Sequence, residues 1–142
     1  MGGNPAGAVR DRAAMVAGAV PDRMPGLWVF ASLADPGRAA ALAPQALASF
    51  RESEGVSLVL PLDVAAAEGL DTALPMACLT LRVVSALDGV GLTAAVAAAL
   101  AAQEIPANVV AAFHHDHLLV PADRAEAAMA ALSALAAGVA IR

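Results

Sequence analysis

The chain has 142 residues, of which 60% are hydrophobic and 15% are charged, and its net charge is −5. This length fits one domain or two small ones, and folding can bury roughly two-thirds of the unfolded surface. The eight basic residues are all arginines and are scattered along the sequence. Because no basic cluster is available to neutralise phosphates, nucleic acid is excluded as an expected partner.

The longest uncharged runs cover 89–102 and 127–141. A membrane span needs roughly 18 or more apolar residues, so these runs are interpreted as buried helices instead. The N-terminal 21 residues lack the continuous apolar stretch of a secretory signal. We therefore expect a soluble, cytoplasmic protein with no membrane partner.

The first half of the chain predicts short elements, and its first eight or so residues are expected to be frayed. In order, these elements are a short helix over 10–20, a strand over 26–33, a brief helix before Pro44, a strand ending near Phe50, a strand over 56–60, and a helix capped by Asp63 and ended by Gly69. Trp28 and Phe30 alternate with Val29 in the second of these elements, which predicts a strand buried on both faces. Both aromatic residues are assigned to the core.

The second half has clearer patterns. In order, it predicts a strand over 77–84, a loop over 85–91, a helix from Leu92, two β-rich runs on either side of the histidines, a helix with Asp123 and Glu126 at capping-box spacing, and a last short strand over 139–141. The single cysteine, Cys78, lies in an apolar strand-like run, so no disulfide framework within the chain is expected. We interpret Cys78 as a small buried hydrophobic residue.

The order of these elements is β-α-β-β-α, with a last strand in the second half, and a shorter version of it occupies the first half. This order is that of the ferredoxin-like split βαβ unit, repeated twice. We therefore predict an α+β protein of two tandem βαββαβ domains with antiparallel sheets, the first one eroded. The expected boundaries are 1–23 for an N-terminal tail with a short helix, 24–74 for the first domain and 75–142 for the second.

The segment 77–135 resembles an ACT domain, the small ligand-binding module of aspartate kinase and other enzymes of amino-acid metabolism. The strand "CLTLRVVS" leads into "LDGVGLTAAVAAAL", in which Asp88, Gly91 and Leu92 match the family's Asp-x-x-Gly-Leu turn. The following "AAQEIPANVVAAF" matches the helix exit and the second strand. Val90 departs from the pattern, since many ACT domains have proline there. Over roughly 27–135, the chain is also similar to small bacterial proteins made of two ACT-like domains in tandem.

The resemblance implies a regulatory or sensor protein that binds an amino acid or a similar small metabolite, has no catalytic activity of its own and needs no cofactor. We also expect a homodimer, because the helix from Leu92 is apolar and uncharged and because exposed sheet edges need to be covered. Within the ligand site, the resemblance implies that Asn108 and Val109 line the same edge as the Asp88 loop.

The loop from Asp88 to Leu92 supports a binding site on physical grounds. Gly89 and Gly91 allow close backbone approach, and the start of the next helix offers unpaired N–H groups that can hold a carboxylate. Val90 lies between the two glycines, and Asp88 is suited to accept from a ligand ammonium group. A simpler interpretation also stands, in which Asp88 caps the helix and the glycines only turn the chain.

The segment "HHDH" places His114, His115 and His117 around Asp116. In an extended chain His115 and His117 share one face, while His114 and Asp116 share the other. A zinc site needs three or four ligands and the cysteine is distant in sequence, so we predict no metal site and no catalytic residues. We expect hairpin-tip histidines at the ligand pocket or at an interface. A metal- or histidine-dependent enzyme and a purely structural interaction module remain the alternatives.

Overall fold

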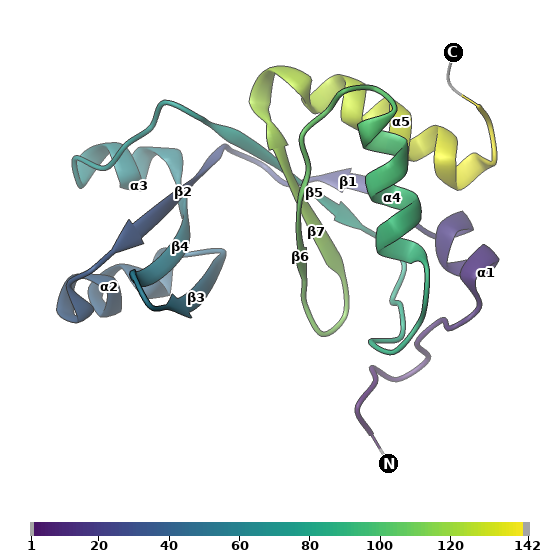
Figure 1. Cartoon of the computed structure of the whole chain (residues 1–142), viewed down its shortest axis with the longest axis horizontal. Helices are drawn as coiled ribbons and strands as arrows, with labels where there is room; N and C mark the ends of the chain where they lie inside the picture. The colour runs from purple at the N-terminus through teal and green to yellow at the C-terminus, as the bar shows by residue number, and fades with distance from the viewer. Residues whose placement is uncertain (1, 141–142) are drawn as a thin grey trace. The chain divides into compact units, whose positions relative to one another are not determined.

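The computed structural model describes residues 2–140 of the chain. The chain divides into two compact units: unit 1 combines Met1–Met24 with Ala77–Arg142, and unit 2 is Pro25–Met76. Both units contain antiparallel strand pairs together with helices, which confirms the predicted α+β class (Figure 1). No helix in the described part of the chain is long and apolar enough to cross a membrane.

Unit 2 is built on three antiparallel strands. The strands are β2 (Trp28–Leu33), β3 (Ala48–Glu52) and β4 (Gly55–Pro61), in the order β3-β4-β2. The helical elements are α2 (Pro36–Leu42), the 3-10 turn η1 (Ala43–Gln45) and α3 (Leu62–Ala67). This is the β-α-β-β-α order that the sequence predicts for the first half.

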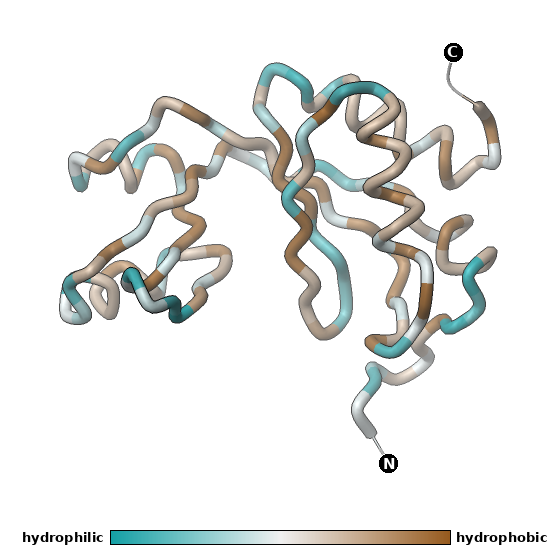
Figure 2. Tube along the Cα trace, in the orientation of Figure 1, coloured by the Kyte–Doolittle hydropathy of each residue, from teal (hydrophilic) through white to brown (hydrophobic). Residues whose placement is uncertain are grey.

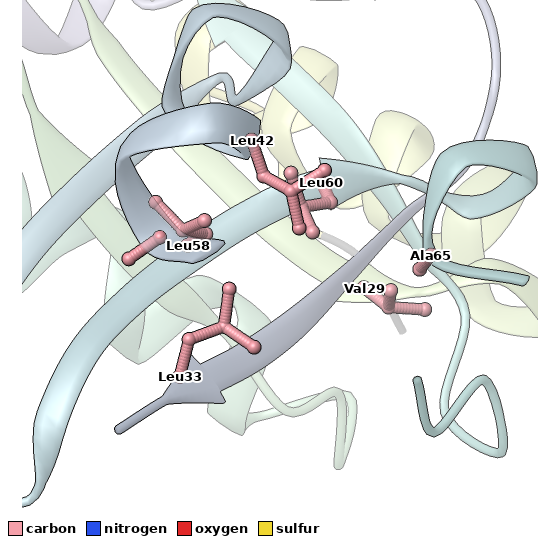
Figure 3. Close-up of a cluster of buried hydrophobic side chains, with 7 residues drawn as sticks. Val29, Leu33, Leu42, Leu58, Leu60 and Ala65 are labelled. Atoms are coloured by element: carbon pink, nitrogen blue, oxygen red, sulfur yellow. The ribbon is translucent and has the colours of Figure 1, made fainter. Parts of the chain in front are cut away.

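The core of unit 2 lies between its helices and one face of its sheet (Figure 3). Val29 and Leu33 point from β2 toward Leu58 and Leu60 of β4, and Leu42 of α2 closes the cluster. Alternation along β2 puts Phe30 on the other face, where it is 45% exposed. The prediction of a strand buried on both faces, with Phe30 in the core, is therefore wrong, because β2 has an apolar partner layer on one side.

The sheet of unit 1 follows the order β1-β5-β7-β6. Its strands are β1 (Pro21–Arg23), β5 (Met76–Leu81), β6 (Asn108–Ala111) and β7 (Asp116–Pro121), and Met76, the first residue of β5, belongs to unit 2. β1 pairs with β5 and β6 pairs with β7, both antiparallel. A strand that precedes unit 2 in the sequence thus lies beside a strand that follows it.

Three helices of unit 1 contact one another and lie together beside the sheet (Figure 1). They are α1 (Arg12–Ala17), α4 (Leu92–Ala101) and α5 (Ala125–Ala137), and the 3-10 turn η2 (Ala122–Arg124) precedes α5. Leu100 of α4, Leu118 of β7 and Leu132 of α5 are completely buried. Burial of a leucine side chain contributes roughly 1.5–3 kcal/mol, so these contacts fix α4 and α5 on the sheet.

Several features at the ends of the chain and at the starts of its helices differ from the sequence predictions. The segment expected as a separate tail contributes α1 and β1 to unit 1. Asp63 lies in the first turn of α3, whose N-cap is Pro61, and Asp123 lies in η2, so that α5 begins after Arg124 without the predicted capping box. Val139 and Ala140 form no strand in the described chain, and Ile141 lies outside the described residues.

Candidate functional site

The loop that precedes α4 has the backbone geometry expected of it. Gly91 is the N-cap of α4 and has φ 108°, a value that side-chain-bearing residues rarely adopt. No side chain of residues 2–140 caps this helix. The first backbone N–H groups of a helix lack partners within it and carry partial positive charge. The start of α4 is therefore open to an acceptor from outside the helix.

A pocket of about 320 Å³ lies at this loop. Its lining comes from α1, the loop before α4, the start of α4 and the end of the β6–β7 hairpin. The residues are Met15, Ser85, Ala86, Leu87, Gly89, Val90, Gly91, Leu92, Thr93, Ala111, Ala112 and Asp116. The lining thus includes Gly89, Val90, Gly91 and Leu92 of the expected ligand site, together with residues of the hairpin and of α1. The volume suits a small metabolite.

Asp88 has partners within the chain. Its Oδ1 atom lies 2.7 Å from Nη1 of Arg10, and Nδ2 of Asn4 donates a hydrogen bond to the same oxygen at 3.1 Å. The hydrogen bond from Arg10, followed by that from Asn4, holds the pKa of Asp88 below its usual value. Asp88 is not among the pocket-lining residues in the described chain. It ties the N-terminal segment to the loop.

The N-terminal segment covers this loop through the backbone as well. Val9 donates to the carbonyl of Val84 at 2.8 Å, and Ala86 donates to the carbonyl of Val9 at 2.8 Å. Gly89 packs closely against α1, because a Cβ at this position would lie 2.9 Å from the sulfur of Met15. The predicted close approach at Gly89 is therefore made by α1 of the same chain.

Asp116 is the first residue of β7 and lines the same pocket. Its side chain is partly buried, and no group of residues 2–140 forms a hydrogen bond or an ion pair with its carboxylate. Burial raises the pKa of Asp116, and this effect exceeds the opposing influence of His117 and His115. Asp116 is the only ionisable side chain among the described residues that line the pocket.

Asn108 and Val109 lie at the beginning of β6, where Asn108 pairs with Leu119 and donates to its carbonyl at 3.3 Å. The pocket is lined instead by Ala111 and Ala112, at the end of that strand. Asn108 and Val109, which the sequence analysis assigns to the ligand site, are not among the described residues that line this pocket. Asp116 is the residue that the sequence analysis missed at this position.

Two of the three histidines, His115 and His117, bond to the neighbouring strand β5. Nδ1 of His115 lies 2.9 Å from the carbonyl oxygen of Leu81, and Nδ1 of His117 lies 2.9 Å from the hydroxyl oxygen of Thr80. Both partners are in β5, so these two histidines join neighbouring strands. A carbonyl only accepts, so His115 carries a proton on Nδ1. In Figure 2 this hydrophilic stretch, at the start of β7, is coloured teal.

His114 is exposed, and its ring stacks edge-on against Phe113 with the ring centroids 4.9 Å apart. In the described part of the chain, no group of three or more His, Cys, Asp and Glu side chains is arranged to hold a metal ion. Cys78 is fully buried, and burial raises the pKa of its thiol to about 11. It therefore carries no thiolate for metal binding or nucleophilic attack near neutral pH.

A second hollow, of about 710 Å³, lies where α1, α4 and the end of α5 meet. Half of its lining residues are alanine, and Arg12 and Asp11 supply its charged groups. It includes none of the residues that the sequence predicts for ligand binding. The smaller pocket at the start of α4 therefore remains the candidate site.

One ACT domain model matches residues 74–134, and a second ACT domain model matches residues 8–77. The chain belongs to the ACT domain family. The two matches run in tandem, as the sequence predicts, and all residues that line the pocket at the start of α4 except Met15 fall within 74–134. ACT domains are small-molecule-binding regulatory modules, which places the chain in that functional class.

Two solved structures resemble this ACT protein over most of its length. A Vibrio cholerae protein of unknown function, described as a possible transport protein, shares 36% identity and has a TM-score of 0.75, covering 84% of this chain and 93% of its own. An Agrobacterium tumefaciens protein shares 21% identity with a TM-score of 0.59, covering 82% and 87% respectively, which shows a common fold. Among proteins with curated descriptions, no similar sequence is found.

Proposed function

We propose that the chain is an amino-acid-binding regulatory protein without catalytic activity of its own, and that the ligand occupies the pocket at the start of α4. The observation that carries this proposal is the coincidence of three features in one pocket. These features are a helix start that no described side chain caps, a glycine-containing loop before it, and a volume of about 320 Å³.

The helix start is suited to the ligand carboxylate. Leu92 and Thr93 both line the pocket and belong to the first turn of α4. Their backbone N–H groups, together with the partial positive charge at a helix N-terminus, favour an anionic group.

The absence of catalysis is proposed from the pocket lining. Among its described residues the lining contains the hydroxyl groups of Ser85 and Thr93, but neither a histidine nor a cysteine. A nucleophilic hydroxyl needs a base within hydrogen-bond reach. The carboxylate of Asp116 shares the lining, but no hydrogen bond joins it to Ser85 or Thr93 in the described chain, and His115 and His117 are bonded to β5 instead. This arrangement supports binding rather than acyl or group transfer.

A homodimer is part of the same proposal. Exposed edge strands bind copies of themselves readily, and β3 and β6 lie at the ends of the strand orders of their units. The side chains of α4 include no charged residue. Light scattering coupled to gel filtration tests this point, and a monomer mass at all concentrations would contradict it.

A thermal-shift screen against the twenty amino acids tests the function. A ligand present at 100 times its dissociation constant stabilises the folded state by about 2.7 kcal/mol, which is a readily detected shift. We expect at least one amino acid to raise the melting temperature. A screen in which no amino acid does so, at concentrations up to the millimolar range, would overturn the proposal.

A further inference from the structure

Two histidines of the β6–β7 hairpin have one ring nitrogen fixed by the neighbouring strand. Nδ1 of His115 lies 2.9 Å from the carbonyl oxygen of Leu81, and Nδ1 of His117 lies 2.9 Å from the hydroxyl oxygen of Thr80. Nε2 of each ring has no hydrogen-bond or ion-pair partner among residues 2–140. Each ring is therefore oriented through one nitrogen and keeps its other nitrogen free of protein partners.

This arrangement is the one in which proteins hold metal-binding histidines. A histidine that coordinates a metal through one ring nitrogen almost always donates the N–H of the other to an acceptor such as a backbone carbonyl. The carbonyl of Leu81 only accepts, so the neutral ring of His115 has its proton on Nδ1 and a lone pair on Nε2. The hydroxyl of Thr80 accepts as well as donates, so the same tautomer is open to His117.

The two histidines are anchored close together. They are two positions apart in the sequence, and their partners, Thr80 and Leu81, are consecutive residues of β5. Residues two positions apart in an extended chain share one face, which favours a common location for the two Nε2 atoms. In the order of the sheet, β7 lies between β5 and β6, so the strand that carries them is held on both sides. A binding site on such a strand is more rigid than one on a loop.

The chemistry of the two nitrogens selects the kind of ion. Neutral imidazole suits zinc, copper, nickel and iron, whereas calcium and magnesium prefer oxygen ligands. Other ligating side chains of unit 1 are engaged elsewhere: Asp116 lines the pocket at the start of α4, and Cys78 is fully buried with a protonated thiol. Within the described chain no group of three such side chains is formed. One chain thus supplies two ligands, and water fills the other coordination positions.

We propose that His115 and His117 bind one divalent transition-metal ion through their Nε2 atoms. This site is separate from the pocket at the start of α4 and goes beyond the proposed function, on which it does not depend. Both rings are partly buried, so the ion binds at the surface of the hairpin with open positions for water or for a further ligand. Nickel is expected to bind at least as tightly as zinc, and magnesium is not expected to bind.

Isothermal titration of the metal-free full chain with Ni²⁺, Zn²⁺ and Mg²⁺ tests this proposal. We expect saturable binding of Ni²⁺ and of Zn²⁺ and none of Mg²⁺. Loss of a direct ligand should cost at least as much as loss of an outer partner, so His115→Ala and His117→Ala should each weaken binding by about tenfold or more. His114→Ala is the matched control, because His114 is exposed and stacks on Phe113, and it should bind as the wild type does.

NMR of the histidine rings in the wild type gives a readout that does not depend on the folding of any variant. Titration with Zn²⁺ should shift the ring signals of His115 and His117 and leave those of His114 unchanged. Three results would each overturn the proposal. They are no saturable binding of Ni²⁺ or Zn²⁺ up to the millimolar range, an equal loss of affinity in His114→Ala, and zinc-induced shifts that bypass His115 or His117.

Discussion

Asp88 Oδ1 and Arg10 Nη1 lie 2.7 Å apart and join the loop before α4 to the N-terminal segment, 78 positions earlier in the sequence. Arg10→Ala removes this ion pair. We expect faster hydrogen exchange at the amides of Val9 and Ala86, which bond across the same junction. Hydrogen exchange measured by mass spectrometry should become faster at these two amides. The control variant Arg23→Ala removes the 3.8 Å contact with Glu126 and should leave exchange at both amides unchanged.

The same pair predicts a pH dependence. Folding lowers the pKa of Asp88 from its usual 3.8. The stabilisation of this junction by the ion pair is therefore fully present above pH 3.8 and is lost as the pH falls through the lower pKa of the folded state. Protection of Val9 should therefore be constant near neutral pH. Equal protection in the wild type and in Arg10→Ala at neutral pH would show that the ion pair contributes nothing to this junction.

His117 predicts a loss of stability on acidification. Burial, followed by the nearby charge of His115, lowers its pKa from 6.5, while Asp116 raises it less. The unfolded chain therefore binds more protons just below pH 6.5, and stability decreases as the pH falls through this range. Urea unfolding from pH 7.5 to 5.5 should show a weaker decrease in His117→Gln than in the wild type. The exposed His114→Gln should follow the wild type, and identical slopes in all three proteins would refute the assignment.

A side chain at position 55 would be sterically excluded in unit 2. The φ of Gly55 is +143°, and a Cβ there would lie 2.5 Å from the carbonyl oxygen of Leu33, a backbone atom that cannot rotate away. Gly69 has φ +67° with nothing within 4 Å of the corresponding position. Gly55→Ala should destabilise the unit by about 3 kcal/mol, and Gly69→Ala by about 1 kcal/mol. Urea unfolding followed by the fluorescence of Trp28 measures both, and equal losses would contradict the contact at Leu33.

Cys78 predicts an unreactive thiol. It is fully buried, and its pKa is raised to about 11, so the nucleophilic thiolate is scarce at pH 8. Ellman's reagent should therefore modify no thiol of the native protein within minutes and one thiol after denaturation in urea. Ser133→Cys, at an exposed position of α5, should add one rapidly reacting thiol. Rapid reaction of Cys78 in the native wild type would contradict its burial.

The elements with strong local patterns were predictable from the sequence. Leu92, Val96 and Leu100 recur at helical spacing and are all buried in α4, and Gly138 ends α5 as expected. The turn into α4 was also predictable from local residues, because Gly91 adopts a positive φ that glycine permits. These features depend on neighbours in the sequence.

The features that were missed depend on distant partners. β1 has only three residues, Pro21–Arg23, and two of them are charged, so no alternation marks it as a strand. Its ion pair between Asp22 and Arg82, at 2.7 Å, joins residues 60 positions apart. Likewise, the sequence offers no sign that Asp88 pairs with Arg10, or that the end of β6 rather than Asn108 reaches the pocket. Alternation did separate Asp116 from His115 and His117, but only the fold brings Asp116 to the loop before α4.

The central claim is that an amino acid binds in the pocket at the start of α4. Two-dimensional amide NMR of the labelled protein, titrated with the amino acid that stabilises it most, tests this claim directly. We expect saturable shifts at Gly89, Gly91, Leu92, Thr93 and Asp116, with unit 2 largely unchanged. Shifts confined to other residues, or no saturable shifts at all, would contradict it.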